Sequence, residues 1–330
     1  MEKVKTVYWK VNPESPDPKI IKKAAELLKK QELVAFPTET VYGLGARADS
    51  SRAVAGIFTA KGRPAQNPLL VHVSKMTQLE GLVKVIPDTA RLLIDKFWPG
   101  PLSIILPARD EVPDIVRGGR TTVGLRMPAH PVALALIDEA GPVAAPSANL
   151  SGRPSPLSAE HVKADLDGRI AAVLDAGSTG IGLESTLIDL STERYKILRL
   201  GGLPLEDLRQ LLGDSLEITA NNSDKLPHYQ TSSEIIICDS PEDFIKQQEY
   251  CREYKKNFAI VSSSNGCQHI INKSVAVYQL NLERNSSNLY SVLREAEEAG
   301  VEILLFSPLP EDLHQVNPTL LDRIKRAGKK

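Results

Sequence analysis

The stretch with the clearest chemical potential is FPTETVYGLGA, residues 36–46, which combines two threonines, a glutamate, a tyrosine and two glycines. Residues 43–48 fit the pattern G-x-G-x-x-A, which binds a dinucleotide when it links a strand to a helix. That context is missing, because Pro37 interrupts the lead-in and the position about 20 residues further on lies in basic AKGRP and carries no acid. The glycines are therefore expected to form a plain turn, which leaves the preceding threonines and glutamate unexplained.

A basic pair follows in AKGRPAQNPLLVHV, where Lys61 and Arg63 stand two residues apart at the end of a predicted helix. Cations at a helix end are often only partners of the helix dipole. Pro64 pushes Arg63 toward extended geometry, and on an extended segment side chains i and i+2 share a face. The pair is then suited to a polyphosphate. His72, inside the following apolar strand, is more typical of a satisfied core histidine.

Polar side chains also gather beside later apolar strands. Arg126 lies within TTVGLRMP, where its buried charge requires an acidic partner or an anionic ligand. The stretch APSANLSGRPSP is either a serine-rich turn or a set of hydroxyls and amides at a strand end, the place where α/β folds bind ligands. GLESTLIDL and ILRLGG repeat the theme. The side chains concerned are Thr122, Ser147, Asn149, Ser151, Ser155, Ser185, Thr186 and Arg199.

The elements that must position these residues alternate along the chain. Short apolar runs such as LVAF (33–36), SIILPA (103–108) and PVAAPSAN (142–149) predict strands. Amphipathic stretches predict helices over 18–30 and within 50–62, the second with Ser50 or Ser51 as N-cap. The sequence therefore predicts an α/β domain with a twisted sheet, whose strand order cannot be read from it.

The texture changes after about residue 215, which predicts two domains. A polar segment without periodicity, 216–233, is expected to link a catalytic domain (1–215) to a small α/β, Rossmann-like domain (234–330). In the small domain EIIICD, FAIVSSS, VAVYQLN and VEILLFSP are predicted strands that alternate with helices.

Composition excludes several classes of function. The 330 residues are 42% hydrophobic and 25% charged with net charge −1, as in an ordinary soluble protein without a global field for nucleic acid or membrane. No apolar run reaches the roughly 18 residues of a membrane span. Cys238, Cys251 and Cys267 are widely spaced, which argues against a disulfide framework or zinc site and favours the cytoplasm.

Taken together, the segments FPTETVYGLGA, AKGRPAQNPLLVHV, TTVGLRMP, APSANLSG and STLIDL, in that order, resemble the YrdC-like threonylcarbamoyl-AMP synthases in their longer, two-domain form. The resemblance implies that the larger domain has a twisted, open, mixed sheet flanked by helices. It also implies that L-threonine, bicarbonate and ATP give L-threonylcarbamoyladenylate and pyrophosphate. A tRNA threonylcarbamoyl transferase would then use the product for the t6A modification, and weak contact with tRNA is a further expectation.

The resemblance also assigns roles to residues, with Lys61 and Arg63 as the catalytic phosphate clamps. Mg²⁺ would be bound mainly through the ATP phosphates, with no protein metal ligand assigned. The ATP site would comprise Lys61, Arg63, Asn67, Thr122, Ser147, Asn149, Ser155, Arg199 and Tyr229. The threonine site would comprise Thr38, Thr40, His72, Arg126, Ala145 and Ser185.

Two other hypotheses compete with the synthase. An RNA-binding module without synthase activity is suggested by basic residues near predicted loops and strand ends, but interleaved aromatic residues for base stacking are missing. A dinucleotide oxidoreductase rests only on the glycines of residues 43–48. Binding of ATP, threonine and a nicotinamide cofactor would separate the three.

Overall fold

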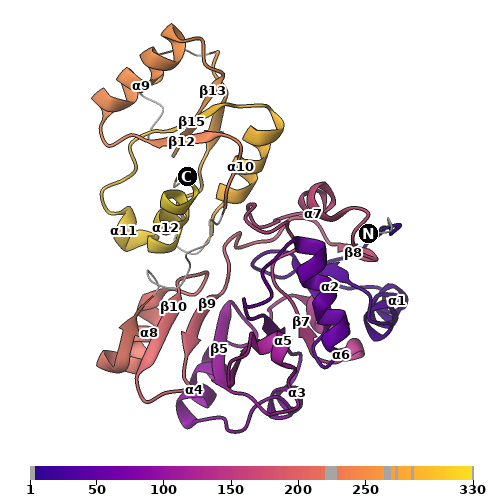
Figure 1. Ribbon diagram of the computed structural model, residues 1–330. Helices are drawn as coiled ribbons and strands as arrows, with labels where there is room; N and C mark the ends of the chain where they lie inside the picture. Colours follow the sequence, from indigo (N-terminus) through magenta and orange to yellow (C-terminus); the bar gives the residue numbers. More distant parts are fainter. Residues whose placement is uncertain (1–3, 220–228, 264–268, 272–273, 284–285, 329–330) are drawn as a thin grey trace. The chain divides into compact units, whose positions relative to one another are not determined.

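The computed structural model describes residues 4–219, 229–263, 269–271, 274–283 and 286–328 (Figure 1). The chain divides into two compact units, a larger one of residues 1–151 and 155–224 and a smaller one of residues 152–154 and 225–330. Within the described residues, no helix combines the length and apolarity needed to cross a membrane. Cys238 and Cys251 are free thiols, and Cys267 lies outside the described residues. So do residues 220–228, which are half of the predicted linker 216–233.

The larger unit is built on one mixed sheet with the strand order β1-β8-β2-β3-β7-β4-β6-β5-β9-β10-β11. Its strands are β1 (Val7–Lys10), β2 (Val34–Phe36), β3 (Gly43–Arg47), β4 (Leu70–His72), β5 (Leu102–Pro107), β6 (Thr122–Arg126), β7 (Val143–Ala144), β8 (Ala172–Asp175), β9 (Thr186–Asp189), β10 (Tyr195–Arg199) and β11 (Leu216–Ile218). Parallel pairs such as β4 with β6 alternate with antiparallel pairs such as β2 with β3. The predicted mixed α/β fold is therefore present.

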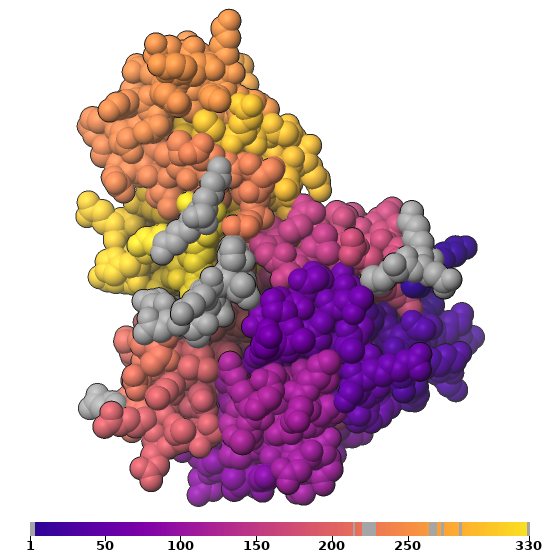
Figure 2. Space-filling model, in the orientation of Figure 1, coloured from indigo at the N-terminus to yellow at the C-terminus, as the bar shows by residue number. Residues whose placement is uncertain are grey.

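The helices of this unit begin and end where their residues favour it. They are α1 (Pro18–Lys29), α2 (Ser51–Lys61), α3 (Met76–Glu80), α4 (Asp88–Phe97), α5 (Asp114–Arg117), α6 (Pro131–Ala140), α7 (Ala159–Leu166) and α8 (Leu205–Leu212), and a 3₁₀ turn, η1, spans Gly213–Ser215. Of the two predicted N-caps of α2 it is Ser50 that caps the helix, because its side chain accepts a hydrogen bond from Ala53 N at 3.2 Å. Figure 2, in the orientation of Figure 1, shows α2 at the surface of the larger unit.

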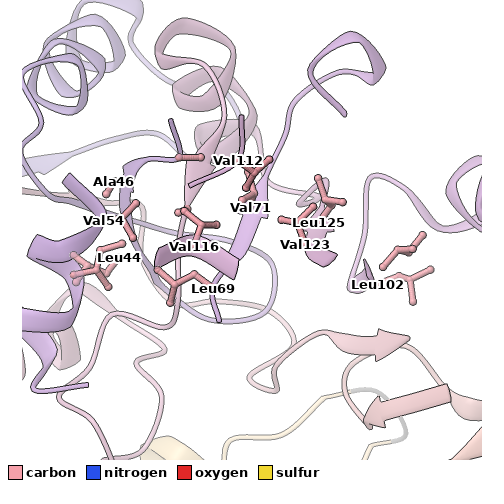
Figure 3. Close-up of a cluster of buried hydrophobic side chains, with 14 of the residues drawn as sticks. Leu44, Ala46, Val54, Leu69, Val71, Leu102, Val112, Val116, Val123 and Leu125 are labelled. Atoms are coloured by element: carbon pink, nitrogen blue, oxygen red, sulfur yellow. The ribbon is translucent and has the colours of Figure 1, made fainter. Parts of the chain in front are cut away.

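Hydrophobic clusters cover both faces of the sheet, because successive residues of a strand point to opposite sides. Val34 and Phe36 of β2 join one cluster with α1 and α6, whereas Ala35 between them joins the other. Ala172 and Val173 of β8 divide in the same way. Figure 3 shows part of the second cluster, which draws on β3, β4, β5, β6 and α2. The strands that carry the predicted site residues are thus fixed on both sides.

The expectation of a turn at the glycines of residues 43–48 is wrong, because Gly43–Arg47 forms strand β3, antiparallel to β2. A Cβ at Gly45 would lie 2.8 Å from Val143 Cγ1 and 2.9 Å from Phe36 Cε1. Glycine is therefore required there for close packing. No helix starts inside the motif, so the dinucleotide hypothesis fails on its own structural criterion.

The smaller unit has a parallel sheet with the order β12-β15-β13-β14. Its elements are β12 (Glu234–Ile237), α9 (Pro241–Glu253), β13 (Phe258–Ser262), β14 (Val277–Gln279), α10 (Leu289–Glu298), β15 (Ile303–Phe306), α11 (Leu313–Val316) and α12 (Pro318–Ala327). The predicted alternation of strands and helices is present.

Residues 152–154 belong to the smaller unit although they lie far from it in sequence. Arg294 of α10, only 2% exposed, donates from Nη2 to Pro154 O at 2.5 Å. Arg153 pairs with Glu297 on the same helix. A buried guanidinium needs such partners, since an uncompensated charge in the interior is costly.

Candidate active site

The loop 37–42 between β2 and β3 is held in place by a chain of hydrogen bonds whose direction can be deduced. Thr38 Oγ1 donates its single proton to Val41 O at 2.7 Å. The 2.8 Å contact between Thr40 Oγ1 and Thr38 Oγ1 therefore uses the proton of Thr40. Arg126 Nη1 then donates to Thr40 Oγ1 at 2.9 Å. Both hydroxyls are directed inward, and Thr40 is the one that meets the arginine.

Arg126 ends β6 and is the buried cation at the centre of this cluster, with 4% of its surface exposed. Its Nε donates to Gly100 O at 3.2 Å, and its Nη2 lies 2.7 Å from Glu39 Oε2. Sequence reasoning required an acidic partner or an anionic ligand for this charge. The acidic partner is Glu39, from the loop that the sequence left unexplained.

His72 stands beside Arg126, because β4 and β6 pair in parallel with these two residues in register. Burial, reinforced by the charge of Arg126, lowers the pKa of His72 from 6.5 to about 3. The imidazole is therefore neutral at physiological pH. Within the described residues its Nδ1 has no hydrogen-bond partner. His72 is buried as a core histidine would be, but a neutral imidazole with an unused ring nitrogen can also bind a hydroxyl or amine.

The same face of the sheet carries a serine that sequence reasoning missed. Ser103 lies on β5, where alternate residues point to the side of Arg126, and its Oγ is 2.7 Å from Ser185 Oγ. Arg199 at the end of β10 donates to both the Oγ and the carbonyl oxygen of Ser185, each at 3.0 Å. A lone serine in the apolar run SIILP is the only sequence signal for this position.

The backbone at Glu184 and Ser185 packs closely against Gly201, which follows β10. A Cβ on Gly201 would lie 2.2 Å from Glu184 O and 2.3 Å from the carbonyl carbon of Ser185. These are backbone atoms that cannot swing aside, so this approach requires glycine. Glu184 is 8% exposed, and its Oε1 accepts from Ser155 Oγ at 2.8 Å. Ser155 and Ser185 are thereby connected through the turn.

Lys61 ends α2 and fastens the loop after β7. Its Nζ donates to Ser147 O and to Asn149 O, both at 2.5 Å, and lies 3.5 Å from Asn149 Oδ1. The main chain is joined as well, because Ser151 N donates to Lys61 O at 2.8 Å. The loop 147–151 is therefore shaped by a buried ammonium group.

The expectation of an extended Lys61–Arg63 segment is wrong. Gly62 adopts a left-handed conformation, φ 61°, which ends the helix between the two cations. Arg63 instead turns toward the following loop, where its Nη2 donates to Pro68 O at 3.4 Å. The two cations therefore have different surroundings. The ammonium group of Lys61 is buried against the loop 147–151, whereas Arg63 contacts the segment before β4.

The remaining predicted residues differ in position. Thr122 starts β6 and shares a face with Arg126, whereas Asn67 lies half-buried in the segment before β4. Ala145 follows β7, and its N donates to Leu70 O at 2.9 Å. Tyr229 belongs to the smaller unit, where its ring stacks on Tyr290 with centroids 5.1 Å apart.

Two groups of the larger unit meet through the backbone. Gly43, which follows the threonine-rich loop, forms an isolated antiparallel bridge with Ser147 of the lysine-held loop. One group holds a buried guanidinium, a carboxylate, hydroxyls and a neutral imidazole. The other presents a serine and an asparagine around a buried ammonium. Such an arrangement can bind a small polar molecule beside a second ligand.

Comparisons with known proteins match this chain over both units. The Sua5/YciO/YrdC family model, described as telomere recombination, matches residues 26–201, and the model of the threonylcarbamoyl-AMP synthase C-terminal domain matches residues 204–328. The threonylcarbamoyl-AMP synthase of Pyrococcus abyssi is 40% identical over 93% of this chain and 94% of that protein. The synthase of Bacillus subtilis is 39% identical over 98% of each.

Solved structures agree with the sequence matches. The crystal structure of P. abyssi Sua5 complexed with L-threonine superposes with a TM-score of 0.88 at 38% identity and covers 98% of both chains. Escherichia coli YciO matches with a TM-score of 0.54 at 25% identity, over 59% of this chain and 95% of its own.

Proposed function

Since this chain belongs to the Sua5/YciO/YrdC family of threonylcarbamoyl-AMP synthases, we propose that it condenses L-threonine, bicarbonate and ATP into L-threonylcarbamoyladenylate and pyrophosphate. The observation that carries the proposal is the pair of groups joined at the bridge between Gly43 and Ser147. One has the charges and hydroxyls for an amino acid, and the other has a shaped polar loop for a nucleotide.

The residues around Arg126, here called the threonine group, form the proposed threonine site. In it Arg126 binds the carboxylate of the substrate, because a guanidinium offers a fork of N–H donors that matches a carboxylate. The neutral His72 and the hydroxyls of Thr40 and Ser185 surround the remaining polar atoms. A site built to hydrogen-bond a hydroxyl discriminates against an isostere that lacks it, because its own polar groups stay unpaired. L-Valine, which replaces the hydroxyl of threonine by a methyl group, is therefore a poor substrate.

The residues around Lys61, here called the nucleotide group, form the proposed ATP site. In it Lys61 shapes the loop of Ser147 and Asn149, and Arg63 faces the phosphates. The further contacts proposed for ATP within the larger unit come from Asn67, Thr122, Ser155 and Arg199. Across the described residues no cluster of three or more His, Cys, Asp or Glu side chains is arranged to hold a metal. Mg²⁺ would reach the site on ATP, bound by phosphate oxygens and water, and would neutralise phosphate charge.

The chemistry requires mainly positioning. The threonine ammonium and bicarbonate give a carbamate, water and a proton. A carbamate oxygen then bonds to the α-phosphorus as the bond to pyrophosphate breaks. Holding the nucleophile and the α-phosphate in line converts an encounter of separate molecules into reaction within one complex. Fixed donors around the phosphates stabilise the developing charge. A tRNA threonylcarbamoyl transferase would consume the product, a reactive mixed anhydride.

The test is pyrophosphate release from ATP by the purified full-length chain, with L-threonine and bicarbonate omitted in turn. We expect release to require both, and a threonylcarbamoyladenylate product to be found by mass spectrometry. Release at the same rate without L-threonine would identify a different nucleotide hydrolysis and overturn the proposal.

A further inference from the structure

Glu39 is a charged side chain in the threonine group to which the proposed reaction gives no task. Its side chain is 14% exposed and that of Arg126 is 5% exposed, so both charges lie largely out of water. Removing two charges from water is costly, and their attraction offsets the cost only when their other hydrogen-bonding groups are also satisfied. A buried pair of this kind should therefore show further partners.

The hydrogen-bonding capacity of this pair is not filled by the described residues. Among the residues that the structure describes, neither carboxylate oxygen of Glu39 has a hydrogen-bond donor. In the same part of the chain, Arg126 Nη2 has no acceptor in hydrogen-bond geometry, although it lies 2.7 Å from Glu39 Oε2. In native proteins such buried exceptions usually indicate a water, an ion or a ligand. The unfilled positions lie on the two charged groups that face each other.

Neighbouring hydroxyls do not satisfy the carboxylate, because their protons are used elsewhere. Thr38 donates to Val41 O, and Thr40 donates to Thr38. The backbone of the loop is also fixed, since Ile181 N donates to Glu39 O at 2.8 Å and Gly182 N donates to Thr40 O at 3.1 Å. The loop therefore holds Glu39 beside Arg126 with two buried carboxylate oxygens that receive no hydrogen bond from the described residues.

An α-amino acid carries the complementary charges on neighbouring atoms. Its carboxylate accepts the forked donors of an arginine, and its ammonium group has three N–H donors for a carboxylate. We propose that Glu39 recognises the amino group of L-threonine while Arg126 recognises the carboxylate, so that the zwitterion is read by a matching ion pair. This inference rests on the proposed function and assigns to Glu39 a binding role in it.

The test compares two ligands by isothermal titration calorimetry on the full-length chain, with a non-hydrolysable ATP analogue present. The ligands are L-threonine and the 2,3-dihydroxybutanoate of matching configuration, which replaces the ammonium group by a hydroxyl. We expect Glu39→Gln to weaken L-threonine binding about 10- to 100-fold, as for the loss of a hydrogen bond to a charged group. Binding of 2,3-dihydroxybutanoate should change less than about twofold, because it has no ammonium group to lose.

Two further variants make the result unambiguous. Glu14→Gln removes an exposed carboxylate whose charge, like that of Glu39, favours the protonated form of His130. We expect this variant to leave the affinities for both ligands unchanged. Glu39→Asp keeps the charge but withdraws it by one methylene, and it should show a smaller loss confined to L-threonine. It also provides the test if Glu39→Gln does not fold, as judged by circular dichroism.

Equal losses for both ligands would overturn the inference, because they would mean that Glu39 acts only by holding Arg126. Unchanged L-threonine affinity in both Glu39 variants would overturn it as well. A wild-type chain that bound the ATP analogue but no L-threonine would overturn the proposed function, and this inference with it.

Discussion

Both units of this chain bury arginines, but they use buried polar side chains differently. In the larger unit such groups contact each other, as in the chain Arg126–Thr40–Thr38 and the group Arg199–Ser185–Ser103. In the smaller unit they mostly contact the backbone. Ser233 donates to Val301 O, Gln248 to Phe244 O, Asn317 to Glu283 O and Arg294 to Pro154 O.

The difference indicates where function resides. Hydrogen bonds between side chains are a minority in proteins, whereas bonds from side chains to backbone typically complete caps, turns and loop ends. A concentration of side-chain networks around incompletely satisfied charges is typical of a ligand site. In the smaller unit the buried Arg294 binds the backbone of a distant segment at Pro154. The comparison therefore predicts that equal changes to buried cations in the two units have different consequences.

The largest effect is expected from Arg126→Met. Loss of a charge-assisted contact with the threonine carboxylate should lower kcat/KM for L-threonine about 30- to 1000-fold, or roughly 2–4 kcal/mol. The free energy of unfolding should also fall by about 3–5 kcal/mol, because Glu39 is left as a buried unpaired charge. Steady-state kinetics and urea unfolding measure the two quantities. The double variant Arg126→Met/Glu39→Gln should regain stability but not activity. Recovery of both would show that the pair has only a structural role.

Lys61→Met is the next largest change, and it should separate the two groups of the larger unit. Without the ammonium group, the carbonyls of Ser147 and Asn149 lose their donor and the loop loses its shape. We expect ATP affinity to fall about 10- to 100-fold and L-threonine affinity to fall less than about threefold. Titration calorimetry with each ligand is the measurement. Lys75→Met, which removes an exposed pair with Asp138, is the matched control. A greater loss for threonine than for ATP would reverse the assignment of the two groups.

Arg294→Met tests the smaller unit. The substitution removes the donor to Pro154 O, and we expect it to lower the free energy of unfolding by about 1–3 kcal/mol. Adenylate formation by the folded variant should stay within about threefold of wild type. Thermal unfolding and initial rates, measured on the same preparation, give both values. A rate loss above about tenfold without a change in stability would place Arg294 in the chemistry and break the comparison.

The smallest expected effect is a loss of stability at acid pH that arises from His72 in the larger unit. The pKa of His72 is about 3 in the folded chain, against an ordinary value of 6.5, so the unfolded chain takes up a proton first as pH falls. Stability from the neutral imidazole is complete above pH 6.5 and is lost at up to about 1.4 kcal/mol per unit below it. His269 and His314 of the smaller unit are exposed. Urea unfolding between about pH 7.5 and 5.5 should therefore show a steeper loss for wild type than for His72→Gln. Equal slopes would mean that His72 is not the cause.

Local structure was largely predictable from sequence because it depends on local patterns. The helix after Ser50 and the strands at 34–36 and 122–126 follow from capping and apolar runs. Strand β1 was missed because four residues with charged neighbours give a weak signal. Strand β3 was mistaken for a turn, because two glycines normally indicate one. Their packing reason lies in Phe36 and Val143, which no local pattern reveals.

The site was predictable only in part, because its contacts join distant residues. Lys61 and Ser147 are 86 positions apart, as are Thr40 and Arg126. A buried arginine in an apolar strand indicated the need for a counter-charge, but the sequence did not identify Glu39. Likewise, Ser103 becomes significant only when the sheet order places β5 between β6 and β9.

The backbone contact at Gly201 sets a limit on how the protein can be changed by mutation. The polar side chains around Arg126 can be varied in a library that tests other amino acids as substrates. Position 201 offers no such freedom, because every L-residue other than glycine places its Cβ against the peptide of Glu184 and Ser185. Random mutagenesis should therefore return Gly201 unaltered in every active clone, even in clones whose preference for threonine has been lost.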